Sequence, residues 1–225
     1  MSEWEKRLNM KPLLEYGKYY HIYNRGNNYE NLFVEKQDYE HFLKLLEVYI
    51  HSVADIYVWC LMKNHFHIAV RVKDETEIGY LNANNVKAED PEIKWKTYLK
   101  PKPDKIFNKK PNPTQQFKHL FKAYSRWFNI RHQRRGSLFE KNYERKEISN
   151  DTYFSRLILY IHNNPVHHGF VDDFIEYPWT SYETIISEKP TKLKKHEVIY
   201  YFDDLENFKY LHKRFDPEND ERFND

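Results

Sequence analysis

The stretch that decides the fold reads Asn64-His65-Phe66-His67-Ile68-Ala69-Val70-Arg71-Val72. Its apolar residues fall at every second position, which is the period of a half-buried β-strand. The alternate positions carry His65, His67, Ala69 and Arg71, so both imidazoles leave the face opposite the core. Imidazole is the commonest metal ligand in proteins, and side chains two apart on a strand are close enough to share one ion. Two histidines leave such a site incomplete, so other parts of the chain must supply a further ligand and a reactive group.

The composition indicates a soluble intracellular chain. With 225 residues, of which 31% are charged, one domain with additions is expected. No window approaches the roughly 18 apolar residues of a membrane span, and the N-terminal residues lack the apolar region of a secretory signal. The single cysteine, Cys60, excludes an internal disulfide. We therefore expect a cytoplasmic protein without a membrane partner.

Charge is distributed unevenly along the chain. Residues 94–147 hold 16 Lys or Arg against 4 Asp or Glu, and residues 201–225 hold 4 against 8. The small net charge of +2 therefore combines a basic middle segment with an acidic tail. A basic segment of this kind favours contact with a polyanion such as nucleic acid. A solvated, lysine-rich loop would show the same composition.

Periodicity and turn residues predict the following elements. Strands are expected at 19–23, 56–62 and 64–72, with an extended segment at 137–148; helices are expected at 37–52, 114–131 and 151–163, with a weaker helix near 203–212. The nearly all-apolar strand 56–62 is expected to be central and to form a hairpin with the His strand. Residues 74–112 are expected to be a long, mobile insertion with a short helix around 77–85, and the tail from Asp216 is expected to be disordered.

This order predicts an α+β fold, a ferredoxin-like antiparallel sheet with helices packed on one face. The expected organisation is an N-terminal lead-in at 1–17, a domain at 18–185 that contains the 74–112 insertion, and a C-terminal extension at 186–225.

The helix expected at 151–163, together with the residue that follows it, carries candidate reactive groups. Tyr160 and Asn164 are four residues apart and share a helix face, which lies off the apolar stripe. Asn164 offers a carbonyl oxygen that suits Mg²⁺ or Mn²⁺. If the helix crosses the His face of the sheet, His65, His67 and Asn164 bind one divalent ion, and Tyr160 points at whatever that ion polarises.

Other interpretations of these residues remain open. Asn164 precedes Pro165 and could simply end the helix as a cap. Tyr153, on the same helix face, competes with Tyr160 as a nucleophile. His162, His167 and His168 are expected to face solvent or to lie near a bound nucleic acid.

In this order the motifs resemble a known family. His65-Phe66-His67 is similar to the His-hydrophobe-His signature of the single-tyrosine HUH transposases, and Tyr160-Ile161-His162-Asn163-Asn164-Pro165-Val166 is similar to their tyrosine helix. The match is best to the REP-associated tyrosine transposases. Segments 20–26, 136–139 and 177–182 add support, and the resemblance covers roughly 18–185 without the 74–112 insertion. Lys63 departs from the pattern, because relatives often have proline there.

The resemblance implies a metal-dependent DNA strand transferase. His65, His67 and Asn164 would hold Mg²⁺ or Mn²⁺, and Tyr160 would cleave single-stranded or hairpin DNA to leave a 5′-phosphotyrosine and a free 3′-OH. Basic residues would contact DNA phosphates; the candidates are Arg25, Arg135, Lys141 and Arg145. The protein would act as a monomer or homodimer.

Two alternative functions belong to classes other than DNA strand transferases. A non-catalytic DNA- or RNA-binding module could keep the same scaffold, and a metal hydrolase could use water in place of the tyrosine. The intact set of His, Tyr and Asn residues favours the transferase, because a pure binder has no need of it.

Overall fold

The computed structural model describes residues 13–81, 89–98 and 109–216. A central unit follows the order β1 (Tyr19–Arg25), α2 (Lys36–Ile50), β2 (Ala54–Met62), β3 (His65–Val72), α4 (Pro113–Arg131) and β6 (Glu144–Ile148). It is followed by α5 (Asp151–His167), α6 (Tyr182–Ile186), α7 (Lys195–Tyr200) and α8 (Leu205–Arg214). Short 3-10 turns lie at Asn27–Tyr29 (η1) and Phe174–Glu176 (η3).

The four main strands form one antiparallel sheet in the order β2-β3-β1-β6. This is the strand order of a ferredoxin-like βαββαβ unit, so the predicted α+β class is confirmed. The register places His67 of β3 between Cys60 of β2 and Tyr23 of β1. The His strand therefore lies in the interior of the sheet.

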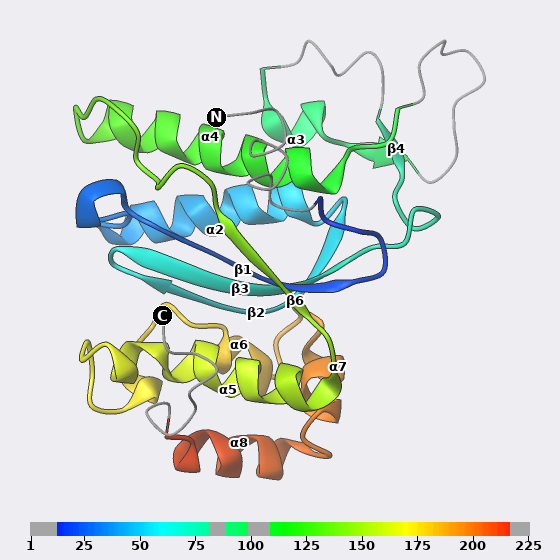
Figure 1. Cartoon of the computed structure of the whole chain (residues 1–225), viewed down its shortest axis with the longest axis vertical. Helices are drawn as coiled ribbons and strands as arrows, with labels where there is room; N and C mark the ends of the chain where they lie inside the picture. The colour runs from blue at the N-terminus through cyan, green and yellow to red at the C-terminus, as the bar shows by residue number, and fades with distance from the viewer. Residues whose placement is uncertain (1–12, 82–88, 99–108, 217–225) are drawn as a thin grey trace, which may run out of the picture.

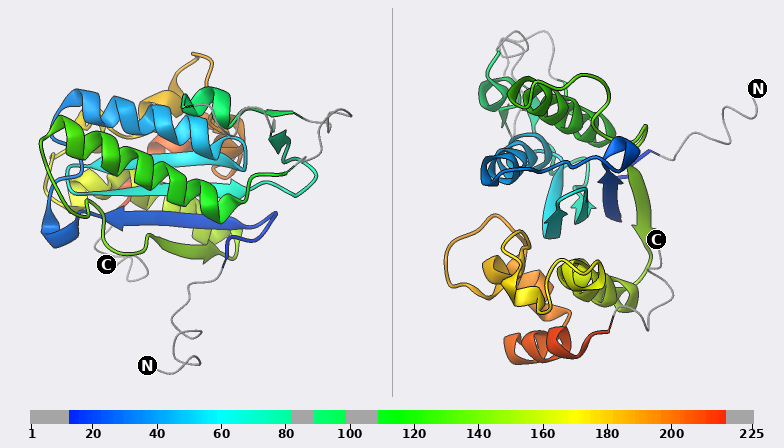
Figure 2. Two further views of the ribbon diagram at one scale, coloured as in Figure 1. Left: turned by 90° about the horizontal axis from the view of Figure 1, so that it is seen from above. Right: turned by 90° about the vertical axis from the view of Figure 1, so that its left-hand side faces the viewer.

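Helices cover both faces of the sheet (Figures 1 and 2). The helices α2 and α4 pack on the face that carries Phe66, Ile68 and Val70, all fully buried as the alternation predicted. The opposite face, which carries Cys60 and Ala69, packs against α5. The expectation of helices on one face is corrected here, because β2 is apolar on both of its faces and the second face also needs cover.

The apolar strand β2 lies at an edge of the sheet instead of at its centre. Its free edge is covered by the chain that follows α5. Leu61 N–H donates to Trp179 O at 2.9 Å, Ser181 N–H to Trp59 O at 2.9 Å, and Lys194 N–H to Ile56 O at 3.0 Å. Covering an edge in this way satisfies its polar backbone groups, so an apolar edge strand is stable here.

Helix α5 passes through the predicted stop at Asn164-Pro165 and ends at His167. Its N-terminus is as predicted, since the Asn150 side chain accepts from Tyr153 N–H at 2.8 Å. Pro165 has no N–H to donate to Ile161 O, but the helix continues past it, and His168 N–H donates to Asn164 O at 3.0 Å. Asn164 therefore lies inside the helix, and the interpretation of it as a terminal cap is wrong.

In the insertion, β4 (Tyr80–Leu81) pairs with β5 (Thr97–Tyr98), and α3 (Pro91–Lys94) lies between them. The helix expected at 77–85 is not formed over 77–81, and its remaining residues lie outside the described ones. The tail expected to be disordered lies outside them as well, apart from Asp216.

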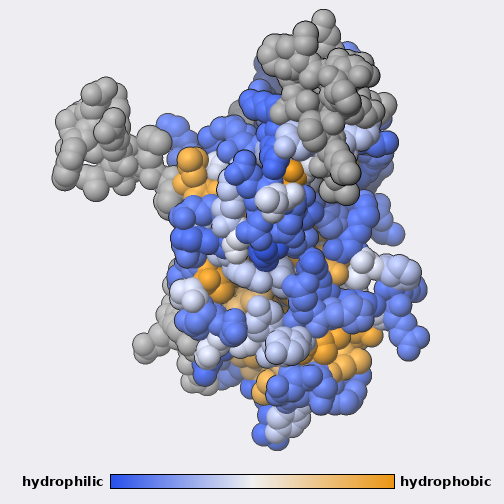
Figure 3. All heavy atoms as spheres, turned by 90° about the vertical axis from the view of Figure 1, so that its right-hand side faces the viewer, coloured by the Kyte–Doolittle hydropathy of each residue, from blue (hydrophilic) through white to orange (hydrophobic). Residues whose placement is uncertain are grey.

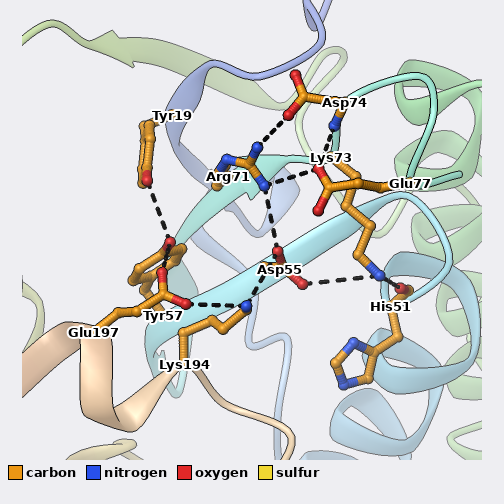
Figure 4. Close-up of polar contacts among 10 residues, drawn as sticks. All are labelled: Tyr19, His51, Asp55, Tyr57, Arg71, Lys73, Asp74, Glu77, Lys194 and Glu197. Carbon is orange, nitrogen blue, oxygen red and sulfur yellow. Dashed lines mark hydrogen bonds and ion pairs between the residues drawn. The ribbon is translucent and has the colours of Figure 1, made fainter.

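Polar contacts attach the C-terminal extension to the sheet (Figure 4). Asp55 of β2 lies 3.6 Å from Arg71 of β3 and 3.7 Å from Lys194. The Tyr57 hydroxyl donates to Glu197 of α7 at 2.5 Å. These contacts hold α7 against the end of the sheet away from His65.

On the face shown in Figure 3, hydrophilic side chains predominate and hydrophobic ones cover smaller areas. Every helix within the described ranges is too short or too polar to cross a membrane.

Candidate metal and nucleophile site

Helix α5 crosses the sheet face that carries the two histidines. His65 Nε2 lies 3.3 Å from Asn164 Oδ1. The Tyr160 ring stands edge-on to His67, with ring centroids 5.6 Å apart, and the rings of His65 and His67 are 5.3 Å apart. The structure thus brings together His65, His67, Asn164 and Tyr160, which come from one strand and one helix 93 residues further along the chain.

Both ring nitrogens of His65 lie close to an amide oxygen. Its Nδ1 lies 2.8 Å from Asn64 Oδ1 and its Nε2 3.3 Å from Asn164 Oδ1. Burial, the neighbouring His168 and Arg25 together lower the pKa of His65 to about 4, against one hydrogen bond that raises it. A neutral imidazole has one N–H and can donate to one amide oxygen. If Nδ1–H donates to Asn64 Oδ1, the Nε2 lone pair faces Asn164 Oδ1, a contact that either a cation or rotation of the Asn164 amide would relieve.

His67 is the more deeply buried imidazole, with 1% of its surface exposed. Its Nδ1 lies 2.9 Å from Nε2 of His21 on β1, whereas its Nε2 is buried without a hydrogen-bond partner. Burial, and next the neighbouring His21, hold the pKa of His67 well below its usual range. Burial also lowers the pKa of His21 to about 3. Both rings are therefore neutral at pH 7, the form in which imidazole binds metals.

These donors fit a divalent cation. Two ligands at right angles about 2.1 Å from Mg²⁺ lie about 3.0 Å apart, close to the 3.3 Å between His65 Nε2 and Asn164 Oδ1. The unpartnered Nε2 of His67 could supply a third donor. Among the described residues no group of three or more His, Cys, Asp or Glu side chains could hold a metal ion. A metal site here therefore needs the amide of Asn164.

Tyr160 is buried, with 1% of its surface exposed. We expected its helix face to lie off the core stripe, but contact with His21 and His67 from β1 and β3 covers the ring. The competing Tyr153 lies two turns earlier on α5, under the ammonium group of Lys146. The geometry therefore puts Tyr160 beside the histidines, while Tyr153 packs near β6.

A hollow of about 420 Å³ opens beside His65. Its lining includes Tyr23, Arg25, Tyr29, Asn64, His65, His67, Glu140 and His168. Arg25 lies over the Tyr29 ring and forms an ion pair with Glu140 at 2.9 Å. The hollow thus provides a cation and exposed aromatic surface within reach of His65.

A second hollow of about 420 Å³ adjoins the first and shares Asn24 and Glu140 with it. Lys118, Lys141 and Arg145 line it, and the Arg145 guanidinium lies over the Tyr143 ring at 5.1 Å. Of the four predicted DNA contacts, Arg25 lines the first hollow and Lys141 and Arg145 the second. Arg135 is exposed in the turn after α4 and lines neither.

The basic surface continues along α4. This helix contains no Asp or Glu, and Lys118, Lys122 and Arg126 are exposed at four-residue spacing along one side of it. In the described part of the chain, none of the three forms an ion pair with a carboxylate. The second hollow and this side of α4 share Lys118 and carry basic side chains, whereas Glu140 and Glu144 line the first hollow beside Arg25.

Sequence reasoning missed two histidines of the site and misplaced a third. His21 and His168, whose ring is 4.7 Å from that of His65, were not assigned to the site. The alternation of Tyr19, His21 and Tyr23 could have indicated that His21 shares a face with the site. His162, expected to face solvent or to lie near a bound nucleic acid, is fully buried between Ser181 and His212, because the C-terminal extension covers that side of α5.

No protein-family model matches the chain, and no curated protein matches it in sequence. Among solved structures, a REP-associated tyrosine transposase bound to a REP hairpin is similar to it. The TM-score is 0.55, and the match covers 81% of this chain and 88% of that one. The two sequences are 12% identical, so what the comparison shows is a shared fold.

Proposed function

We propose that this protein cleaves and rejoins single-stranded DNA through a covalent 5′-phosphotyrosine on Tyr160. The observation that carries the proposal is the meeting of Tyr160 with His65, His67 and Asn164. It occurs on a fold similar to that of a tyrosine transposase bound to a DNA hairpin.

His65, His67 and Asn164 would hold Mg²⁺ or Mn²⁺. Once bound, such an ion acts as a Lewis acid toward a phosphate oxygen. The Tyr160 oxygen loses its proton to solvent and attacks phosphorus, the bond from phosphorus to the 3′ oxygen breaks, and that oxygen takes up a proton and leaves as a 3′-OH, so no net proton is gained or lost. The phosphodiester energy stays in the phosphotyrosine, so the reverse attack by a 3′-OH rejoins DNA without ATP.

The burial of Tyr160 sets the order of events. Because 1% of the side chain is exposed, DNA binding must open the contact between α5 and β1 before the phenol can reach a phosphate. The basic surface at Lys118, Lys141 and Arg145 allows DNA to bind before that opening. Phosphate contacts there would fix the position of the strand without reading its bases.

A labelled DNA hairpin with single-stranded flanks, incubated with the protein and Mg²⁺ or Mn²⁺, tests the proposal. The wild-type protein should give a covalent adduct in a denaturing gel. Tyr160→Phe should abolish it, whereas the matched control Tyr153→Phe, on the same helix, should retain it. An adduct that survives in Tyr160→Phe would move the nucleophile elsewhere.

The metal ligands have a separate test. His65→Ala and His67→Ala should lose adduct formation but still bind the hairpin. Normal cleavage by both variants would remove the metal site from the mechanism.

The alternative of a non-catalytic nucleic-acid-binding module has one observation in its favour, the near-complete burial of both Tyr160 and His67. This alternative predicts hairpin binding by the wild-type protein with no adduct in either metal.

A further inference from the structure

Among the described residues, two pairs of buried histidines contact each other through ring nitrogens, and one of these pairs has a buried ring nitrogen without a partner. In the first pair, His212 Nδ1 donates to Phe208 O at 2.7 Å and His162 Nδ1 lies 2.8 Å from His212 Nε2. His162 Nε2 lies 2.8 Å from the Ser181 hydroxyl. Every ring nitrogen of that pair has a partner, as expected for a structural contact.

The second pair, His21 and His67, is incomplete. His67 Nδ1 lies 2.9 Å from His21 Nε2, but His67 Nε2 is buried with no partner. It belongs to the ring that lies beside His65 and Tyr160. A buried nitrogen without a partner carries a cost in folding, so its presence here needs a reason.

One hydrogen is shared between the two neutral rings, which allows two arrangements. If His67 Nδ1–H donates to His21 Nε2, the lone pair of His67 lies on Nε2 and can bind a metal. If His21 Nε2–H donates instead, His67 carries its hydrogen on Nε2, which then cannot be a ligand. The partner of the second nitrogen sets which tautomer a ligating histidine adopts.

The ring of His21 is held in place to accept that hydrogen. It meets the ring of His67 edge to edge, with centroids 5.1 Å apart and ring planes 23° apart, and its centroid lies 4.7 Å from that of Tyr23. The Tyr160 ring stands nearly perpendicular to the His21 ring, with ring centroids 6.5 Å apart. With 4% of its surface exposed, His21 has little room to turn away.

We propose that His21 is a positioning residue: its Nε2 accepts from His67 Nδ1–H and thereby directs the His67 Nε2 lone pair at the divalent ion. This inference rests on the metal site of the proposed function, but not on the identity of the nucleophile or on DNA cleavage.

The test compares two substitutions that differ in the acceptor. His21→Phe keeps a flat, buried ring but has no acceptor, whereas His21→Gln keeps an acceptor oxygen near the position of Nε2. Loss of an outer-shell partner typically costs about 10–100-fold in metal affinity. Titration of free Mn²⁺ by electron paramagnetic resonance should show that loss in His21→Phe, and His21→Gln should stay within about threefold of the wild type.

A second measurement needs no variant. In ¹⁵N–¹H spectra of the wild-type imidazoles with saturating Mg²⁺, His67 should carry its hydrogen on Nδ1. Hydrogen on Nε2 would overturn the proposal, and so would wild-type Mn²⁺ affinity in a folded His21→Phe variant. Circular dichroism and thermal unfolding establish that the variants fold, and His196→Phe, which removes an exposed imidazole of α7, serves as the control.

The result separates this inference from the proposed function. If the wild-type protein binds no Mn²⁺, the metal site itself is wrong and this inference falls with it. If it binds Mn²⁺ and His21→Phe binds equally well, the role of His21 alone is refuted. Failure to form a covalent adduct would refute the role of Tyr160 and leave the Mn²⁺ result unaffected.

Discussion

Acidification should destabilise this protein through its buried histidines, and His212 of α8 gives the clearest test. Burial lowers the pKa of His212 to about 4, although the hydrogen bond from its Nδ1 to Phe208 O acts in the opposite direction. In the unfolded chain a histidine has a pKa of about 6.5. Between these two values the unfolded chain takes up a proton that the folded protein does not.

The direction and size of the change in the free energy of unfolding follow from this difference in pKa. The folded pKa lies below the unfolded one, so the full stability is present above about pH 6.5 and is lost as the pH falls toward 4. Each pH unit within the window costs about 1.4 kcal/mol. His212 alone should therefore lower the free energy of unfolding by about 2 kcal/mol between pH 7 and pH 5. His162, whose pKa is also lowered by burial, acts in the same direction.

His212→Gln isolates this contribution, since an amide can accept from His162 and donate to Phe208 O but does not titrate. Urea unfolding at pH 7 and pH 5, followed by tryptophan fluorescence, gives the two free energies for each protein. The wild type should lose about 2 kcal/mol more than His212→Gln over that interval, whatever the variant costs at pH 7. The exposed His196→Gln should lose as much as the wild type. Equal losses in the wild type and His212→Gln would refute the reasoning.

Three further predictions concern charges. Asp55→Asn leaves the cations around it without their central carboxylate and should cost about 1–3 kcal/mol in the free energy of unfolding; urea midpoints in low and high salt should show the difference shrinking as salt screens it. Lys118→Gln with Lys122→Gln should flatten the dependence of hairpin affinity on log salt by about 0.7–0.9 for each phosphate that the variant no longer neutralises; an unchanged slope places the DNA elsewhere. Asn164→Asp should tighten Mn²⁺ binding on the order of tenfold by adding an anionic ligand; weaker binding in a Mn²⁺ titration would count against Asn164 as a ligand.

Local patterns predicted the core of the fold. Strict alternation along β3 identified the buried face of Phe66, Ile68 and Val70, and the 3.6-residue period located α2, α4 and α5 to within a few residues. The hairpin of β2 and β3 also follows from adjacent apolar runs.

The wrong predictions concern residues whose partners come from distant segments of the chain. An all-apolar strand indicates burial on both faces, but its place in the sheet depends on whether another segment covers its edge, as residues 179–194 do for β2. His162 looks like a surface residue until Ser181 and His212 supply its partners. His21 and His67 are 46 positions apart, and only the register of β1 on β3 brings them together.

Helix α5 connects these observations, because its two sides have different partners. Tyr160 and Asn164 face the histidines of the sheet, while His162 and Asn163, between them in sequence, contact His212 of α8. The C-terminal extension is in turn attached to the sheet through Lys194 and Glu197. The position of Asn164 Oδ1 over His65 therefore depends on packing from both sides of α5. Loosening α8 should weaken metal binding even though no residue of α8 belongs to the site.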